Sequence, residues 1–111
     1  RLLSRNGACA ITAAISPYTS VRDEVRAATE ATFVEVYVEA PLEVVEERDT
    51  KGLYKKARAG QIPEFTGITS PYEPPEQPAL RLPTGQLSLA ECAASVQDML
   101  TQKGFLSPPA T

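Results

Sequence analysis

The chain has 111 residues, of which 42% are hydrophobic and 23% are charged, and its formal net charge is −3. This length predicts one small domain with a real core, and the mixed charge argues against a general nucleic-acid-binding protein. No apolar run approaches the roughly 18 residues that a membrane span requires, and no basic-then-apolar leader is present, so we expect no membrane partner and a cytoplasmic location.

The first elements are predicted from apolar patterning. Residues 1–5 resemble the end of a helix that stops at Asn6-Gly7, so we expect the chain to begin partway through a fold. Residues 8–15 are small or β-branched and uncharged, which predicts a strand buried on both faces. Cys9 and Cys92 both lie in apolar contexts; with no histidine they form neither a zinc site nor a disulfide framework, and we expect both to be buried.

A helix and a second strand follow. Ser20 with Asp23 is a helix-capping pattern, and an apolar stripe at helical spacing continues from it through Val21, Val25 and Ala28. Residues 33–38 alternate in the manner of a strand, and Pro41 suits the first turn of a short helix. The alternation of strands and helices predicts an α/β fold with parallel strands and right-handed crossovers.

The second half of the chain has a different character. Six prolines lie between Gly60 and Pro83, and so long a loop in a compact domain is usually functional or disordered. Residues 79–82 are predicted to form a short strand. Ser88 and Glu91 form a capping box for a closing helix that ends at Gly104, and residues 107–111 are expected to be a disordered tail. One face of that helix is predicted to carry Leu89, Cys92, Val96, Met99 and Leu100.

Basic residues are concentrated between Arg48 and Arg58, where Lys51, Lys55 and Lys56 also lie, with Asp49 as the single acid. A positive patch on an acidic chain suggests an anionic ligand, although a solvated helix face remains the plain alternative. Glycines at both ends of the patch, Gly52 and Gly60, favour a moving segment.

Several runs of sequence resemble one known family. They are KGLYKKARAG at 51–60, FTGI at 65–68, SPYE at 70–73, ISPY at 15–18 with Arg22 and Arg26 following, and FVEVYVEAPLEVVEERD at 33–49. Together they are similar to adenylylsulfate (APS) kinases, with the runs at 51–60 and 65–73 corresponding to the lid of that family. The resemblance covers residues 1–106 and implies one APS kinase domain with a lid over about residues 49–78.

The resemblance implies the C-terminal portion of a P-loop kinase fold, in which helices flank a parallel sheet. It also implies transfer of the γ-phosphoryl group of ATP to the 3′-hydroxyl of APS, giving 3′-phosphoadenylyl sulfate (PAPS), with Mg²⁺ accompanying ATP. The implied partners are ATP, APS and a second copy of the chain in a homodimer, and the domain is either free-standing or fused to ATP sulfurylase. A non-catalytic regulatory domain that binds PAPS is the alternative.

Site residues follow from the same resemblance. Phe65 would stack on the adenine of APS, Lys51 would reach its phosphosulfate or ribose, and the remaining APS contacts would be Ile15, Ser16 and Glu64. The ATP contacts would be Arg48, Thr84 and Leu87. Two alternatives stay open, because Phe65 could pack on its own loop and Ser16 could cap the turn before Pro17.

The sequence contains no GxxxxGK[ST] motif, which holds the ATP phosphates in this fold. We therefore expect the P-loop, the catalytic base and the main Mg²⁺ ligands to lie outside these 111 residues, which should be inactive alone. The missing P-loop strand would lie between strands 8–15 and 33–38, leaving backbone groups of both unpaired.

Overall fold

The computed structural model describes residues 8–107, so the predicted helix end at residues 1–5 and most of the predicted tail lie outside the described residues. The chain divides into two units. Unit 1 consists of Arg1–Val34 with Thr50–Gln77, and unit 2 consists of Glu35–Asp49 with Pro78–Thr111. Within residues 8–107, no helix combines the length and apolar content needed to cross a membrane.

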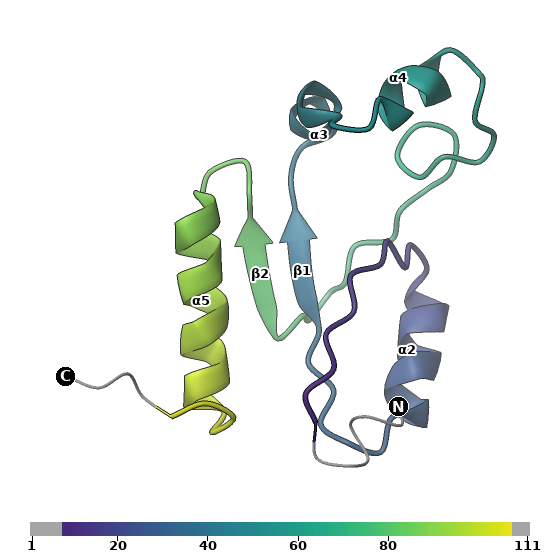
Figure 1. The fold of residues 1–111 in the computed structure, drawn as a ribbon. Helices are drawn as coiled ribbons and strands as arrows, with labels where there is room; N and C mark the ends of the chain where they lie inside the picture. The colour runs from purple at the N-terminus through teal and green to yellow at the C-terminus, as the bar shows by residue number, and fades with distance from the viewer. Residues whose placement is uncertain (1–7, 108–111) are drawn as a thin grey trace. The chain divides into compact units, whose positions relative to one another are not determined.

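Unit 2 contains two parallel strands, β1 (Val36–Glu39) and β2 (Leu80–Pro83). They pair in a register that places Val36 opposite Leu80 and Glu39 opposite Pro83 (Figure 1). The predicted parallel orientation of the strands is confirmed. β1 begins three residues later than residue 33, and β2 begins one residue later than residue 79. Both strands end at the same edge of the sheet, so the residues that follow them are brought together there.

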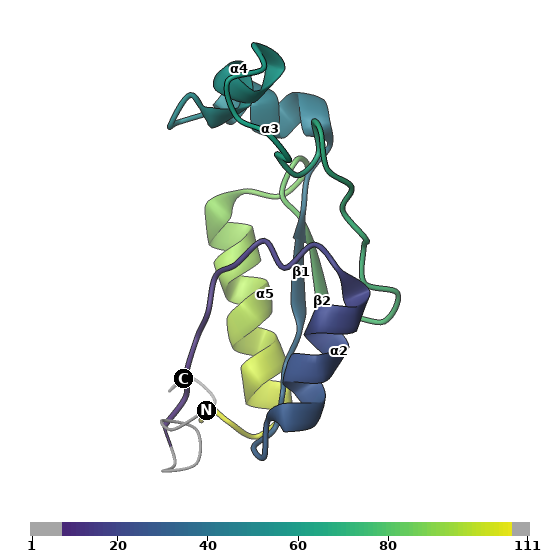
Figure 2. The same ribbon diagram turned by 90° about the vertical axis from the view of Figure 1, so that its right-hand side faces the viewer.

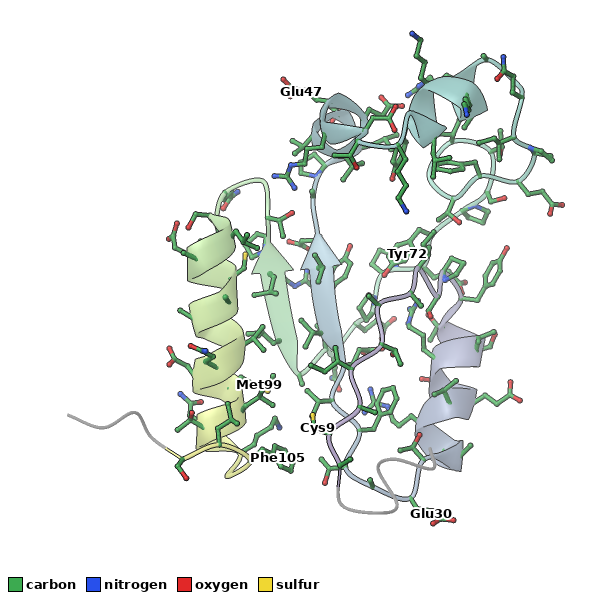
Figure 3. All side chains as sticks on the ribbon, in the orientation of Figure 1. Cys9, Glu30, Glu47, Tyr72, Met99 and Phe105 are labelled. Carbon is green, nitrogen blue, oxygen red and sulfur yellow. The ribbon has the colours of Figure 1, made fainter. Side chains whose placement is uncertain are left out.

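The core of unit 2 lies between β2 and α5 (Leu89–Gln102), which runs alongside β2 in the opposite direction (Figures 1 and 2). Leu82 from the strand and Cys92 and Met99 from the helix are buried, and Figure 3 marks Met99 on α5. Leu89, which was predicted to line the same helix face, is 88% exposed. That prediction was wrong because Leu89 is the first residue of the helix and its side chain packs against little.

Helix α5 has well-formed ends. The predicted capping box is confirmed, because Glu91 N–H donates to Ser88 Oγ at 3.1 Å and Ser88 N–H donates to Glu91 Oε1 at 3.0 Å. The backbone and side-chain hydrogen bonds with Ser88 lower the pKa of Glu91. At the other end, Gly104 has φ +83° and Phe105 N–H donates to Leu100 O, which satisfies a carbonyl of the last turn.

Three further regions of the described chain that were predicted to be helical contain a helix. In unit 2, α3 (Leu42–Arg48) begins directly after Pro41, whose carbonyl accepts from the backbone N–H groups of Val44 and Val45. In unit 1, α2 spans Thr19–Ala28 and α4 spans Leu53–Arg58.

Helix α2 differs from its sequence prediction in two respects. It begins at Thr19, with Tyr18 as the N-cap residue, so Ser20 lies inside the helix and does not cap it. Val21 and Val25 are 47% and 49% exposed, so the predicted apolar stripe forms no core among the described residues.

Residues 8–15 form no strand, which corrects the prediction made from their apolar pattern. Ile11 is 90% exposed and Cys9, marked in Figure 3, is exposed as well, so the prediction of a buried Cys9 was also wrong. The reason is physical: a strand exists only when a neighbour satisfies its backbone groups, and β1 and β2 of the described chain pair with each other.

Candidate functional site

Helix α4 in unit 1 carries Lys55, Lys56 and Arg58 of the basic patch, whereas Lys51 precedes the helix and Arg48 ends α3 in unit 2. Gly52, at φ +66°, takes the left-handed conformation that turns the chain into the helix, and its carbonyl accepts from Lys56 N–H at 3.1 Å. Ala57 is buried and faces inward, whereas the charged side chains around it are exposed. The exposed group comprises Lys51, Lys55, Lys56 and Arg58. Helix α4 therefore presents the charges of Lys55, Lys56 and Arg58 to solvent, and because successive side chains on a helix diverge by about 100°, no single ligand can contact all three.

The loop after α4 is closed on itself around Phe65. The backbone carbonyl of Phe65 accepts from the N–H groups of Ile68, Thr69 and Ser70 at 2.8–3.1 Å, and Phe65 N–H donates to Thr69 Oγ1. Gly67 N–H donates to Ser70 O at 2.8 Å, with Gly67 at φ +90°. These bonds fix the backbone of a proline-rich segment that has no regular secondary structure of its own.

The Phe65 ring is half-buried and meets the Tyr54 ring of α4 edge-on, with centroids 4.9 Å apart and an interplanar angle of 78°. The ring contact of Phe65 is therefore with the preceding helix, whereas the alternative stated from the sequence was packing on its own loop. This contact leaves part of the ring accessible, so packing and ligand stacking are compatible. The neighbouring Glu64 is exposed and has φ +52°, a conformation rare for a residue with a side chain.

Ile15 and Ser16 lie directly before α2. Ile15 is 64% exposed and Ser16 is half-buried with φ +43°. The carbonyl oxygen of Ser16 accepts a hydrogen bond from Arg22 Nη1 of α2. The N-cap residue of α2 is Tyr18, which makes no side-chain capping hydrogen bond, and the first backbone N–H of the helix, that of Thr19, donates to Glu73 Oε1 at 2.8 Å.

In unit 2, the carboxyl ends of the two strands are joined by side chains. Thr84, just after β2, donates its hydroxyl to Glu39 O at 2.9 Å, and its N–H donates to the same carbonyl at 2.8 Å. Arg48, the last residue of α3, donates to both Thr84 Oγ1 (3.2 Å) and Thr84 O (2.7 Å). Two residues predicted as ATP contacts from positions 36 apart are therefore direct neighbours.

A shallow depression of about 330 Å³ opens beside this network, at the carboxyl ends of β1 and β2, where parallel α/β sheets commonly bind ligands. Gly85 belongs to its lining, and a Cβ atom there would lie 3.2 Å from Pro41 Cδ, so a side chain would crowd the wall. Leu87 is half-buried in the same turn, with its N–H donating to Pro83 O at 3.1 Å. The lining consists of Tyr37, Glu39, Ala40, Pro41, Val44, Pro83, Gly85 and Gln86.

The predicted site residues separate by unit. All five predicted APS contacts fall in unit 1, and all three predicted ATP contacts fall in unit 2. Sequence reasoning missed the hydrogen bonds that Glu73 accepts from Thr19 and Arg22, because partners 51 to 54 residues apart leave no local pattern.

The described residues contain no preformed cluster of metal-ligating side chains. Among residues 8–107, no group of three or more histidine, cysteine, aspartate or glutamate side chains could hold an ion. None of the described residues is assigned to the metal.

The parallel strands, the depression at their carboxyl ends and the basic, glycine-bracketed helix define part of an α/β fold of the P-loop kinase class. Comparison with known proteins agrees. The solved structure of the Mycobacterium tuberculosis APS kinase in complex with AMPPNP and APS aligns with a TM-score of 0.83 at 45% identity, covering 90% of this chain and 59% of that one.

The sequence comparisons identify the family. The family model for adenylylsulphate kinase matches residues 1–83, and an adenylyl-sulfate kinase of Acaryochloris marina is 50% identical over 109 residues, covering 97% of this chain and 53% of that protein. A probable bifunctional SAT/APS kinase of Sorangium cellulosum is 49% identical over 106 residues, or 96% of this chain and 18% of that protein. The chain belongs to the adenylylsulphate kinase family and spans about half the length of the first of these relatives.

Proposed function

We propose that this chain is the lid-bearing part of an enzyme that transfers the γ-phosphoryl group of ATP to the 3′-hydroxyl of APS, giving PAPS and ADP. Phosphoryl transfer depends on positioning and on neutralising charge, more than on covalent chemistry by the protein. The roles proposed below for the residues of this chain are of those two kinds.

The observation that carries the proposal is the construction of residues 51–70. Phe65 is held by hydrogen bonds within its own loop and by the edge of Tyr54, yet its ring stays partly accessible. An aromatic ring fixed in this way can stack on a base without losing much freedom on binding, and such stacking contributes about 1–3 kcal/mol per base. The proposed base is the adenine of APS.

Lys51 and α4 supply the positive charge of the proposed lid. Lys51 is exposed directly before the left-handed Gly52, so a change at this glycine would redirect the lysine and the helix together. Closure would bring the lysine onto the phosphosulfate or ribose of APS and exclude water that could otherwise accept the phosphoryl group. Glu64, Ile15 and Ser16 complete the proposed APS contacts.

The ATP side is proposed to lie at the carboxyl ends of β1 and β2. Arg48 already donates two hydrogen bonds to Thr84, which orient its guanidinium group. Thr84 and Leu87 belong to the turn beside the depression. A depression of this kind suits the flat, mostly apolar adenine ring. In this proposal Arg48 lies near the ATP phosphates and also stabilises the turn after β2 through its hydrogen bonds to Thr84.

Other parts of the proposal concern the whole protein. We expect Mg²⁺ to accompany ATP, and we expect the P-loop lysine and the catalytic base to be provided by residues outside these 111, which contain no GxxxxGK[ST] motif. On this basis the 111 residues alone are expected to be inactive, with residues 1–106 forming one domain and about 49–78 its lid. A cytoplasmic homodimer, free-standing or joined to ATP sulfurylase, is the proposed form.

The proposal is tested with protein expressed from the whole gene. ADP release from ATP and Mg²⁺ is measured with and without APS, and PAPS is quantified in the same samples. APS-dependent ADP release with matching PAPS supports the kinase. Saturable PAPS binding without turnover would favour the alternative, a regulatory APS-kinase-like domain.

A further inference from the structure

Arg22 of α2 is the centre of a connection between two distant segments of unit 1. Its guanidinium group donates to Ser16 O, to Glu73 O and, at 3.0 Å, to Thr19 Oγ1. The guanidinium carbon also lies 5.7 Å from the centroid of the Tyr72 ring, whose position Figure 3 marks. One side chain thus contacts both the turn before α2 and residues 72–73 of the proposed lid.

Glu73 completes the connection from the other side. Its N–H donates to Pro17 O at 2.8 Å, and its Oε1 accepts from the N–H of Thr19 at 2.8 Å. The carboxylate therefore satisfies an N–H group in the first turn of α2, where a negative charge is also favourable. We call these five residues, Ser16, Pro17, Thr19, Arg22 and Glu73, the Arg22–Glu73 junction.

The junction also holds an unfavourable backbone conformation in place. Ser16 has φ +43°, in the left-handed region that residues with a side chain rarely adopt. Such a conformation persists only where the surroundings determine it, and the hydrogen bond from Arg22 to the Ser16 carbonyl is such a constraint. The same guanidinium group therefore contributes to the orientation of Ser16 and to the attachment of Glu73, which is also held by Pro17 O and Thr19 N–H.

The opposite end of the segment is built differently. Gly52 and Gly60 bracket α4 with φ +66° and +76°, and a Cβ atom at either position would meet nothing within 4 Å. Free space and glycine backbones permit rotation there. The segment is thus held by hydrogen bonds at Glu73, whereas its backbone can rotate at Gly52 and Gly60.

We infer that Arg22 and Glu73 are positioning residues that fix one end of the lid to the turn carrying Ser16, so that the lid closes from its glycine end against a fixed anchor. The inference rests on the proposed function, since it assigns Ser16 and the lid to APS. Because Arg22 acts through Ser16 and the lid, its loss weakens the use of APS and spares that of ATP.

Steady-state kinetics of the whole protein test the inference. Arg22→Lys keeps the charge but cannot reach three acceptors with a rigid fork, so the KM for APS rises by about tenfold while the KM for ATP stays within about twofold. Arg26→Lys, one turn further along α2, is the matched control and leaves both values unchanged. An unaltered KM for APS in Arg22→Lys, or an equal rise for both substrates, overturns the inference.

Glu73 provides a second variant pair. Glu73→Gln retains an oxygen that can accept from Thr19 N–H, whereas Glu73→Ala does not, so the alanine variant shows the larger rise in the KM for APS. Equal effects of the two substitutions would overturn the role given to the Glu73 side chain.

Amide hydrogen exchange gives a readout that does not need activity. Arg22→Ala speeds exchange at the N–H groups of Thr19 and Glu73 by about tenfold or more, and Arg26→Ala does not. Exchange unchanged by Arg22→Ala contradicts the junction itself. A wild-type protein that makes no PAPS while its exchange responds as described would instead contradict the proposed function, so the two failures are distinguishable.

Discussion

The ring of Phe65 meets the ring of Tyr54 edge-on, at a centroid distance of 4.9 Å, and this contact joins the loop of the proposed lid to its helix. An aromatic pair in this geometry contributes about 0.5–1.5 kcal/mol beyond its buried area. Tyr54 thereby restricts the positions that Phe65 can take before any ligand arrives.

The first prediction concerns this pair. Phe65→Ala should raise the KM for APS strongly, by roughly five- to hundredfold, because the stacking surface is lost. Tyr54→Ala should raise it by about two- to tenfold through lost positioning, and Tyr54→Phe should behave as wild type because the ring remains. Steady-state kinetics with each substrate varied in turn measure these effects; equal losses for APS and ATP would count against the stacking role.

The second prediction compares lysines of the basic patch. Lys51→Ala should lower kcat/KM for APS by about tenfold or more, the usual size of a lost charge-assisted hydrogen bond. Lys55→Ala should have a smaller effect, because Lys55 lies on α4 beyond the left-handed Gly52. A larger loss for Lys55→Ala than for Lys51→Ala would show that we have assigned α4 to the wrong part of the ligand.

The third prediction concerns the network of Arg48 and Thr84. Thr84→Val preserves shape but removes the hydroxyl that accepts from Arg48 and donates to Glu39 O. We expect a KM for ATP raised by about tenfold and an unchanged KM for APS, with Thr84→Ser close to wild type. Kinetics of the three proteins check this, and an effect confined to APS would contradict the assignment of this edge to ATP.

The fourth prediction concerns pH and stability. The pKa of Glu91 is lowered by its hydrogen bonds with Ser88, so the ionised form is favoured in the folded state. Its contribution to stability is therefore fully present above its ordinary pKa of 4.5 and is lost as the pH falls through the lower folded value. In urea unfolding, the stability difference between wild type and Glu91→Gln should narrow between pH 7 and pH 3.

A control for that experiment is Ser88→Ala, which removes the helix cap at every pH and should cost about 1 kcal/mol. A difference between wild type and Glu91→Gln that stays constant with pH would contradict the charge-dependent role of Glu91.

Several signals that are local in sequence predicted local structure, although the capping pattern of Ser20 and Asp23 did not, because α2 begins at Thr19. The capping box at Ser88 and Glu91 and the glycines around α4 depend on residues within one turn of each other, and the structure contains both. The parallel orientation of the strands was predicted from the alternation of strands and helices, but the pairing of β1 with β2 was not.

Structure that depends on contacts between residues far apart in the sequence was harder to predict. The apolar pattern at residues 8–15 is suited to a strand, but pairing decides whether a strand forms, and neither described strand pairs with these residues. Glu73 contacts α2 from 54 residues away, and its sequence neighbourhood gives no indication of this. For the candidate site, the residue types and the family resemblance predicted which residues take part. The hydrogen bonds of Arg48 with Thr84 were visible only in the structure.

Transfer of the phosphoryl group is the most direct test of the proposed function. Protein expressed from the whole gene is incubated with Mg²⁺, APS and ATP labelled in the γ-phosphate, and the position of the label in the products is determined. We expect label in the 3′-phosphate of PAPS, with unlabelled ADP formed in equal amount. Label that remains in ATP, or that appears only in inorganic phosphate, while PAPS still binds would contradict a kinase and indicate a regulatory domain.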